Sequence, residues 1–163
     1  MGYLGKSNMN EFLDFEKQKH TEFFLPYYKK KGWVILQDNL GKSTDWDVYL
    51  ETPEGKFTID EKARSKDYND FLVEIVQDLK SGNKGWLFKD KNYYFYASWE
   101  TKEINPTSFY CIDANKLQEF VVKNWKVLLP TMQISEKGWG ITLFANISWQ
   151  DLLFTKVAKR LEL

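Results

Sequence analysis

The chain of 163 residues carries 23 Lys and Arg against 23 Asp and Glu, so its formal net charge at pH 7 is zero and no global field attracts it to nucleic acid or to an anionic membrane. Its one cysteine, Cys111, and one histidine, His20, exclude a disulfide framework, a cysteine-based zinc site and a histidine-rich metal centre. Because the chain has no run of about 18 apolar residues and no apolar signal segment at its N-terminus, we expect a soluble cytoplasmic protein with no membrane partner.

The first half of the chain switches between helical and strand periods. Asn10 can cap a helix that runs to about residue 25, and Pro26 marks the end of that helix. Strands are predicted over 33–37, 46–51 and 56–63, with a turn at 53–55. Apolar residues at helical spacing predict a second helix over 69–80, and a β-rich segment follows over 93–99.

The second half continues with a strand over 108–112 and a helix that Asp113 caps and that runs to 124. A strand over 141–145 and a last helix over 148–161 complete the pattern. The order is therefore α-β-β-β-α-β with a β-α extension. We expect one α/β (α+β) domain over 1–163, in which helices flank a mixed sheet, with the core over about 10–99 and the extension over about 100–163.

The residues that carry chemistry lie in the stretch 45–62, DWDVYLETPEGKFTIDEK. Asp47 lies on one predicted strand, and Asp60 and Lys62 share one face of the next. Strands joined by a short turn lie about 5 Å apart, so the two carboxylates can share one ion. Mg²⁺ or Mn²⁺ binds oxygen ligands, and the backbone carbonyl of Glu61 is placed to be the third. Lys62 can orient or help to deprotonate a water on the metal and can stabilise negative charge in the transition state.

This arrangement resembles the PD-(D/E)xK phosphodiesterase superfamily, the restriction-endonuclease-like fold. The resemblance rests on Asp47, the twelve residues after it and the tripeptide Asp60-Glu61-Lys62, and the predicted α-β-β-β-α-β order is that of the family's core. Of four [DE]xK matches in the chain, only 60–62 lies on a predicted strand that follows an acid-bearing strand.

Junction-resolvase and RecB-like nucleases are the most similar members, because a helix leads into a Gly-Trp strand, here Gly32-Trp33. Such members often add an acid from the first helix and a glutamine from the helix after the motif. The resemblance therefore implies a further metal ligand at Glu16, with Glu22 as the other candidate, and a catalytic role for Gln77.

The function that the resemblance implies is hydrolysis of DNA by a Mg²⁺- or Mn²⁺-dependent endonuclease or junction-type nuclease. Asp47, Asp60 and Lys62 would be catalytic, the substrate would include branched or single-stranded DNA, and the chain would act as a homodimer, as suits a small phage or mobile-element protein. Surface lysines near the motif are candidates for contacts with DNA phosphates: Lys84, Lys89 and Lys91.

Two alternatives stay open from the sequence. The chain could be a catalytically silent nuclease-fold module that binds nucleic acid or a protein partner, because a stand-alone DNA-cutting enzyme usually has a basic excess. The hairpin could also mimic the motif within an unrelated α+β fold, as an exposed pair of strands with solvated charges would.

Overall fold

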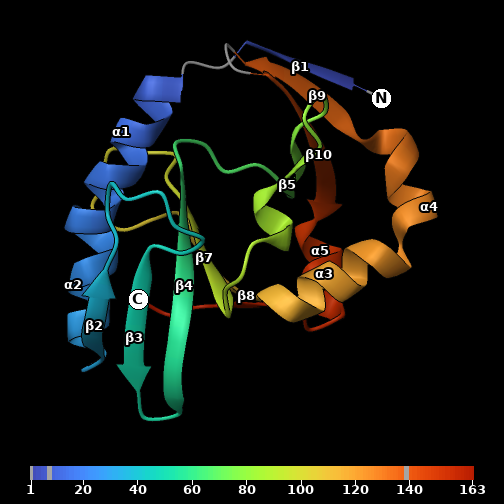
Figure 1. Ribbon diagram of the computed structural model, residues 1–163. Coiled ribbons are helices and arrows are strands. Elements are labelled where there is room, and N and C mark those ends of the chain that lie inside the picture. Colours follow the sequence, from blue (N-terminus) through green and yellow to red (C-terminus); the bar gives the residue numbers. More distant parts are fainter. Residues whose placement is uncertain (1, 7–8, 138–139) are drawn as a thin grey trace. The chain divides into compact units, whose positions relative to one another are not determined.

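A computed structural model describes the backbone of residues 2–6, 9–137 and 140–163 (Figure 1). The chain forms two compact units, each assembled from segments that are not contiguous in sequence. Unit 1 comprises Met1–Asn8, Tyr68–Lys89 and Ala114–Ala158, and unit 2 comprises Met9–Asp67, Asp90–Asp113 and Lys159–Leu163.

Unit 2 is built on a six-stranded sheet with the order β11-β8-β7-β4-β3-β2. The sheet is mixed, because β4 and β7 are parallel whereas β2 and β3, β3 and β4, and β7 and β8 pair antiparallel. The α+β character that the sequence predicts is therefore confirmed. The elements are α1 (Met9–Lys19), a π-helix (His20–Phe24), α2 (Leu25–Lys30), β2 (Val34–Asp38), β3 (Val48–Thr52), β4 (Gly55–Arg64), β7 (Tyr93–Ser98), β8 (Ser108–Asp113) and β11 (Ala158–Arg160).

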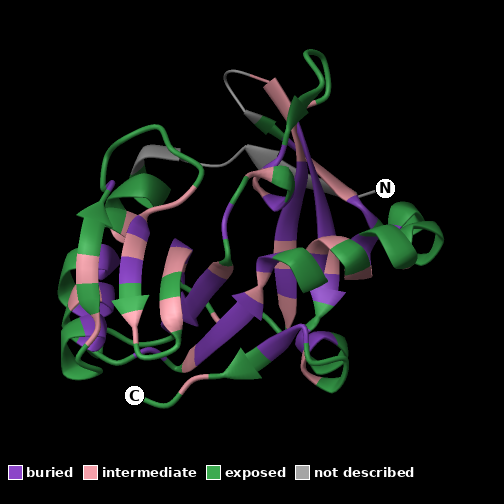
Figure 2. Ribbon diagram, turned by 60° about the horizontal axis from the view of Figure 1, so that its bottom comes forward, coloured by how far each residue is buried: buried purple, intermediate pink, exposed green. Residues whose placement is uncertain are grey.

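One face of this sheet packs against the helical segment in an aromatic core. Phe24 and Tyr28 are fully buried there, together with Val48 and Leu50 of β3. Each such side chain contributes about 1.5–3 kcal/mol by leaving water. Because side chains alternate along a strand, β4 directs Ile59 and Ala63 into this core and Glu61 to the same face. Asp60 and Lys62 point to the opposite face. The central strands β7 and β8 are buried along most of their length, whereas the edge strand β2 is mostly exposed (Figure 2).

Unit 1 contains a five-stranded sheet with the order β1-β9-β10-β5-β6. β1 and β9 are parallel, and β10 is antiparallel to both β9 and β5. Phe71 packs against Trp149, with ring centroids 5.3 Å apart. The elements are β1 (Gly2–Lys6), β5 (Asp70–Asp78), β6 (Asn83–Lys84), a 3₁₀ helix (Trp86–Phe88), α3 (Ala114–Lys123), α4 (Trp125–Leu128), a second 3₁₀ helix (Leu129–Thr131), β9 (Gln133–Lys137), β10 (Gly140–Ser148) and α5 (Trp149–Phe154).

The predicted helix over 69–80 is wrong, because this segment is the strand β5. Phe71, Val73 and Ile75 are buried at alternate positions, which is the period of a strand. β-Branched side chains such as Val73, Ile75 and Val76 favour extended backbone, and pairing with β10 along 70–76 supplies hydrogen bonds from a remote segment. The expected α-β-β-β-α-β order is therefore interrupted: unit 1 strands, not a helix, follow β4 in the chain.

Other element boundaries also differ from the prediction. The first helical segment continues past Pro26 to Lys30, since Pro26 lies in the first turn of α2, where a missing N–H leaves no bond unmade. The last helix ends at Phe154 and is followed by β11, and β1 and β9 are strands that the sequence did not predict. The side chain of Asn10, the expected cap, lies outside the described residues.

The remaining predicted elements are confirmed with shifted ends. The strands β2, β3, β4, β7, β8 and β10 and the helix α3 all form, and β8 and β11 belong to the six-stranded sheet although they follow residue 100. Among the residues that the structure describes, no helix has both the length and the apolar character needed to cross a membrane.

Candidate functional site

The two acids of the predicted motif lie next to each other on neighbouring strands of unit 2. Asp47 immediately precedes β3, and its N–H donates to the Ile59 carbonyl at 2.9 Å, one residue before Asp60 on β4. Val48 pairs with Ile59, so both acidic side chains project from the sheet face opposite the aromatic core. Burial, together with the negative charge of Asp60, raises the pKa of Asp47 to about 8. Burial is the larger cause of this rise, and the neighbouring Asp60 charge is the second.

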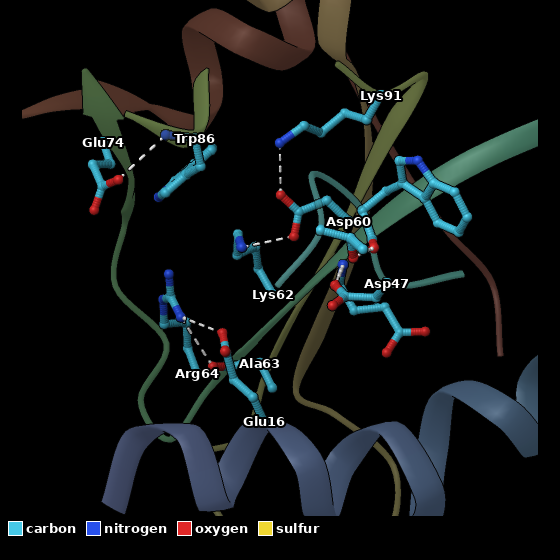
Figure 3. A network of polar contacts seen from close by, with 12 residues as sticks. Glu16, Asp47, Asp60, Lys62, Ala63, Arg64, Glu74, Trp86 and Lys91 are labelled. Carbon is cyan, nitrogen blue, oxygen red and sulfur yellow. Dashed lines mark hydrogen bonds and ion pairs between the residues drawn. The ribbon is translucent and has the colours of Figure 1, made fainter. Parts of the chain in front are cut away.

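Asp60 is held between two ammonium groups (Figure 3). Lys62 Nζ lies 2.7 Å from Oδ1 of Asp60, and Lys91 Nζ lies 2.9 Å from Oδ2. Asp60 is only 6% exposed, and burial alone would raise its pKa, but the two lysines hold the pKa below its ordinary value. Lys62 is likewise desolvated, yet the carboxylates of Asp60 and Glu16 raise its pKa above the ordinary value. Both partners of this pair are therefore charged at neutral pH.

Glu61, the middle residue of the motif, links the two faces of β4. Its backbone N–H donates to Oδ2 of Asp47 at 2.7 Å. The N–H and C=O of one strand residue point to the same side, so the Glu61 carbonyl is directed to this same edge of β4. Its side chain points into the helical layer, where the Tyr28 hydroxyl donates to it at 2.8 Å and His20 Nδ1 lies 2.5 Å away. The helical layer thus fixes the strand residue whose backbone contacts Asp47.

The sequence pattern alone does not connect His20 to the motif. The structure places its Nε2 3.1 Å from Oδ2 of Asp38, so His20 bridges two carboxylates, Asp38 and Glu61. The signal was present in the strand pattern. Glu61 falls in phase with Phe57 and Ile59, and a carboxylate on an apolar face requires a polar partner.

Of the two first-helix acids, Glu16 lies with the motif and Glu22 does not. Glu16 Oε1 accepts a hydrogen bond from Arg64 Nη1 at 3.3 Å (Figure 3). Burial raises the pKa of Glu16, and the positive charges of Lys62 and Arg64 oppose that rise. The side chain of Glu22 is 52% exposed and lies 3.8 Å from Lys19 Nζ.

Three of the remaining predicted site residues belong to unit 1, and the fourth, Lys91, differs from the prediction in its environment. Gln77 is on the strand β5 of unit 1, not on a helix, and its backbone carbonyl accepts from Thr142 Oγ1 at 2.9 Å. Lys84 is exposed and Lys89 is partly buried, and both belong to unit 1. Lys91 is not a surface lysine: its side chain is 0% exposed, because it is paired with the buried Asp60. The expectation that it contacts DNA from the surface is therefore corrected.

The donors near the motif are oxygen atoms, the type that a hard divalent cation prefers. Among the described residues, no three His, Cys, Asp or Glu side chains come together as a metal-binding group. The available donors are the carboxyl groups of Asp47 and Asp60 and the carbonyl of Glu61, all of them oxygen, which Mg²⁺ and Mn²⁺ prefer. The pKa of Asp47 is raised by burial first and by the Asp60 charge second, and a cation between the two acids would offset both effects.

Comparison with known proteins gives the chain no family: no protein-family model matches it, and no curated protein matches it.

Proposed function

We propose that this chain is a divalent-cation-dependent phosphodiesterase of the PD-(D/E)xK type that hydrolyses DNA. The observation that carries the proposal is the juxtaposition of Asp47 and Asp60 on one sheet face with the Lys62 ammonium 2.7 Å from Asp60. The order helix, three antiparallel strands and then a parallel strand, β7, within unit 2 also supports it.

The roles of the residues follow from their chemistry. Asp47, Asp60 and the Glu61 carbonyl would hold Mg²⁺ or Mn²⁺, which supplies Lewis-acid stabilisation and a more acidic water. Lys62 presents a desolvated positive charge, which is worth more to a developing phosphate charge than the same charge in water. Arg64 and Lys62 are both neighbours of Glu16, so Glu16 orients the cationic side of the site. The proposed substrates are DNA duplexes, single strands or junctions, with a homodimer cutting two strands.

The free thiol of Cys111 is buried, which agrees with a protein of a reducing, cytoplasmic compartment, and this location belongs to the proposal.

Cleavage of supercoiled plasmid, single strands and a four-way junction with Mg²⁺ or Mn²⁺ tests the proposal. We expect cutting that EDTA stops and that Asp60→Asn and Lys62→Met each reduce by at least about a hundredfold. The tripeptide Glu100-Thr101-Lys102 supplies matched controls, because it repeats the [DE]xK pattern with its acid and lysine exposed. Glu100→Gln and Lys102→Met should therefore cut like wild type. Equal cutting by Asp60→Asn and wild type would refute the assignment.

A second candidate, the catalytically silent binding module, is favoured by one observation. Both oxygens of Asp60 are already engaged by ammonium groups, at 2.7 Å and 2.9 Å, as in a purely structural ion cluster. This candidate predicts no cutting of any substrate and no shift of the melting temperature with Mn²⁺. The proposed nuclease predicts metal-dependent cutting and a shift of the melting temperature with Mn²⁺.

A further inference from the structure

The ammonium group of Lys91 contacts Asp60, a carboxylate that the proposed function assigns to the metal. Lys91 is two residues before β7 and outside the sequence motif, yet its Nζ is 2.9 Å from Oδ2 of Asp60. Its side chain is 0% exposed, and its ammonium lies 4.8 Å from the centroid of the Tyr94 ring. The fold therefore holds a buried positive charge against a carboxylate that the proposed function assigns to the metal.

The backbone around Lys91 is fixed to the motif strand. Asn92 Oδ1 accepts from the Thr58 N–H at 2.8 Å, and the Asn92 N–H donates to Thr58 Oγ1 at 3.0 Å. Thr58 is two residues before Asp60 on β4, so these bonds hold the 91–92 segment at a defined height along the strand. The Asp90 N–H also donates to Oδ2 of Asp45 at 3.3 Å, close to Asp47 in the chain. Both the segment before β3 and the strand β4 therefore help to fix the loop that carries Lys91.

We infer that Lys91 is a resident counter-cation of the site: its ammonium neutralises Asp60 in the absence of a divalent cation and lowers the affinity of Asp47 and Asp60 for that cation. This inference rests on the proposed function. Asp60 already faces two positive charges, and a third, divalent charge beside them meets repulsion that water screens little in a buried place. A divalent cation must therefore displace Lys91 from Asp60 or bind against its charge.

Lys62 and Lys91 differ in what they are expected to do. Lys62 projects from the same strand face as Asp60 and is assigned to the reacting phosphate, whereas Lys91 approaches from the loop before β7. A merely structural ion pair at Lys91 predicts that its removal loosens Asp60 and weakens cation binding. A resident counter-cation predicts that removal of Lys91 strengthens cation binding. The direction of the change in cation affinity therefore distinguishes the counter-cation role from a structural one.

The affinity for Mn²⁺, measured on the full chain by the loss of its free electron paramagnetic resonance signal, tests the inference. Lys91→Met keeps the apolar stem and removes the charge, and we expect it to raise Mn²⁺ affinity about tenfold or more. Lys91→Gln retains a donor for Asp60 and should also raise the affinity, which covers the case that the methionine variant does not fold. Lys56→Met is the matched control, since it removes a lysine from an exposed pair with Glu51, 3.6 Å away, and should leave the affinity unchanged.

The outcomes separate the inference from the proposed function. Unchanged or weaker Mn²⁺ binding in folded Lys91→Met or Lys91→Gln, with wild-type binding abolished by Asp60→Asn, overturns the counter-cation role alone. Absence of Mn²⁺ binding in wild type and in both Lys91 variants overturns the metal site and the proposed nuclease together. Mn²⁺ binding that is tighter in the Lys91 variants than in wild type, and that is lost when Asp60→Asn is added to those variants, supports both the counter-cation role and the proposed metal site.

Discussion

The raised pKa of Asp47 makes the stability of the protein depend on pH in a direction that can be worked out. Burial and the Asp60 charge raise this pKa from 3.8 to about 8. Between these values the folded state binds a proton that the unfolded state has lost, so stability falls as pH rises. One proton corresponds to about 1.4 kcal/mol per pH unit, or about 2.7 kcal/mol between pH 5 and 7. Asp47→Asn removes the titrating group and keeps an oxygen that can accept from the Glu61 N–H.

Urea unfolding of wild type and Asp47→Asn at several pH values between 5 and 7 measures this difference. We expect the stability of the variant relative to wild type to increase with pH by about 1.4 kcal/mol per unit. Asp14→Asn, which removes a carboxyl from an exposed position of α1, should keep the wild-type dependence. Parallel stability curves for wild type and Asp47→Asn would refute the raised pKa of Asp47, and with it the burial of this carboxyl beside Asp60.

Three further predictions concern the side chains around the motif. His20→Ala leaves the buried Glu61 without its closest partner and should lower the free energy of unfolding at pH 6 by about 3 kcal/mol, whereas a loss below about 1 kcal/mol in urea unfolding would contradict this. Burial opposes the protonation of His20, but the hydrogen bond and charge of Glu61 raise the pKa of His20 to about 9. The contribution of protonated His20 to the free energy of unfolding is therefore complete below about pH 6.5 and is lost as pH rises through 9. Tyr28→Phe removes a hydroxyl that donates to Glu61 at 2.8 Å and should cost about 1.5–3 kcal/mol in the same assay, and an unchanged urea midpoint would exclude that bond. Glu16→Gln should slow plasmid cleavage about tenfold or more while Glu22→Gln cuts like wild type, and equal rates for the two variants would exclude Glu16 from the site.

The sequence predicted the part of the site that depends on local geometry. Asp47 immediately precedes β3, and Asp60 and Lys62 lie on β4. The turn at residues 53–54 joins the two strands, so alternation and a short connection suffice to place the three residues on one face. The position of Lys91 could not be predicted in this way. It depends on the parallel pairing of β4 with β7, in which Asp60 is opposite Tyr94, and segments far apart in the chain set that register.

The prediction for residues 69–80 failed for a related reason. The stretch Phe71-Leu72-Val73-Glu74-Ile75-Val76 is apolar at both helical and strand spacing, so its pattern alone does not distinguish the two. Pairing with β10, about 70 residues later in the chain, decides in favour of the strand. Gln77, for which the resemblance implies a place on a catalytic helix, therefore lies on the strand β5.

The most direct test of the proposed nuclease is the rate at which wild type and Asp60→Asn nick supercoiled plasmid in Mn²⁺, with folding of both proteins verified by circular dichroism. The proposed function predicts Mn²⁺-dependent nicking by wild type that is lost in Asp60→Asn and kept in Glu100→Gln. Nicking that persists in Asp60→Asn, or its absence from wild type with Mn²⁺ and with Mg²⁺, would contradict a phosphodiesterase site at Asp47 and Asp60.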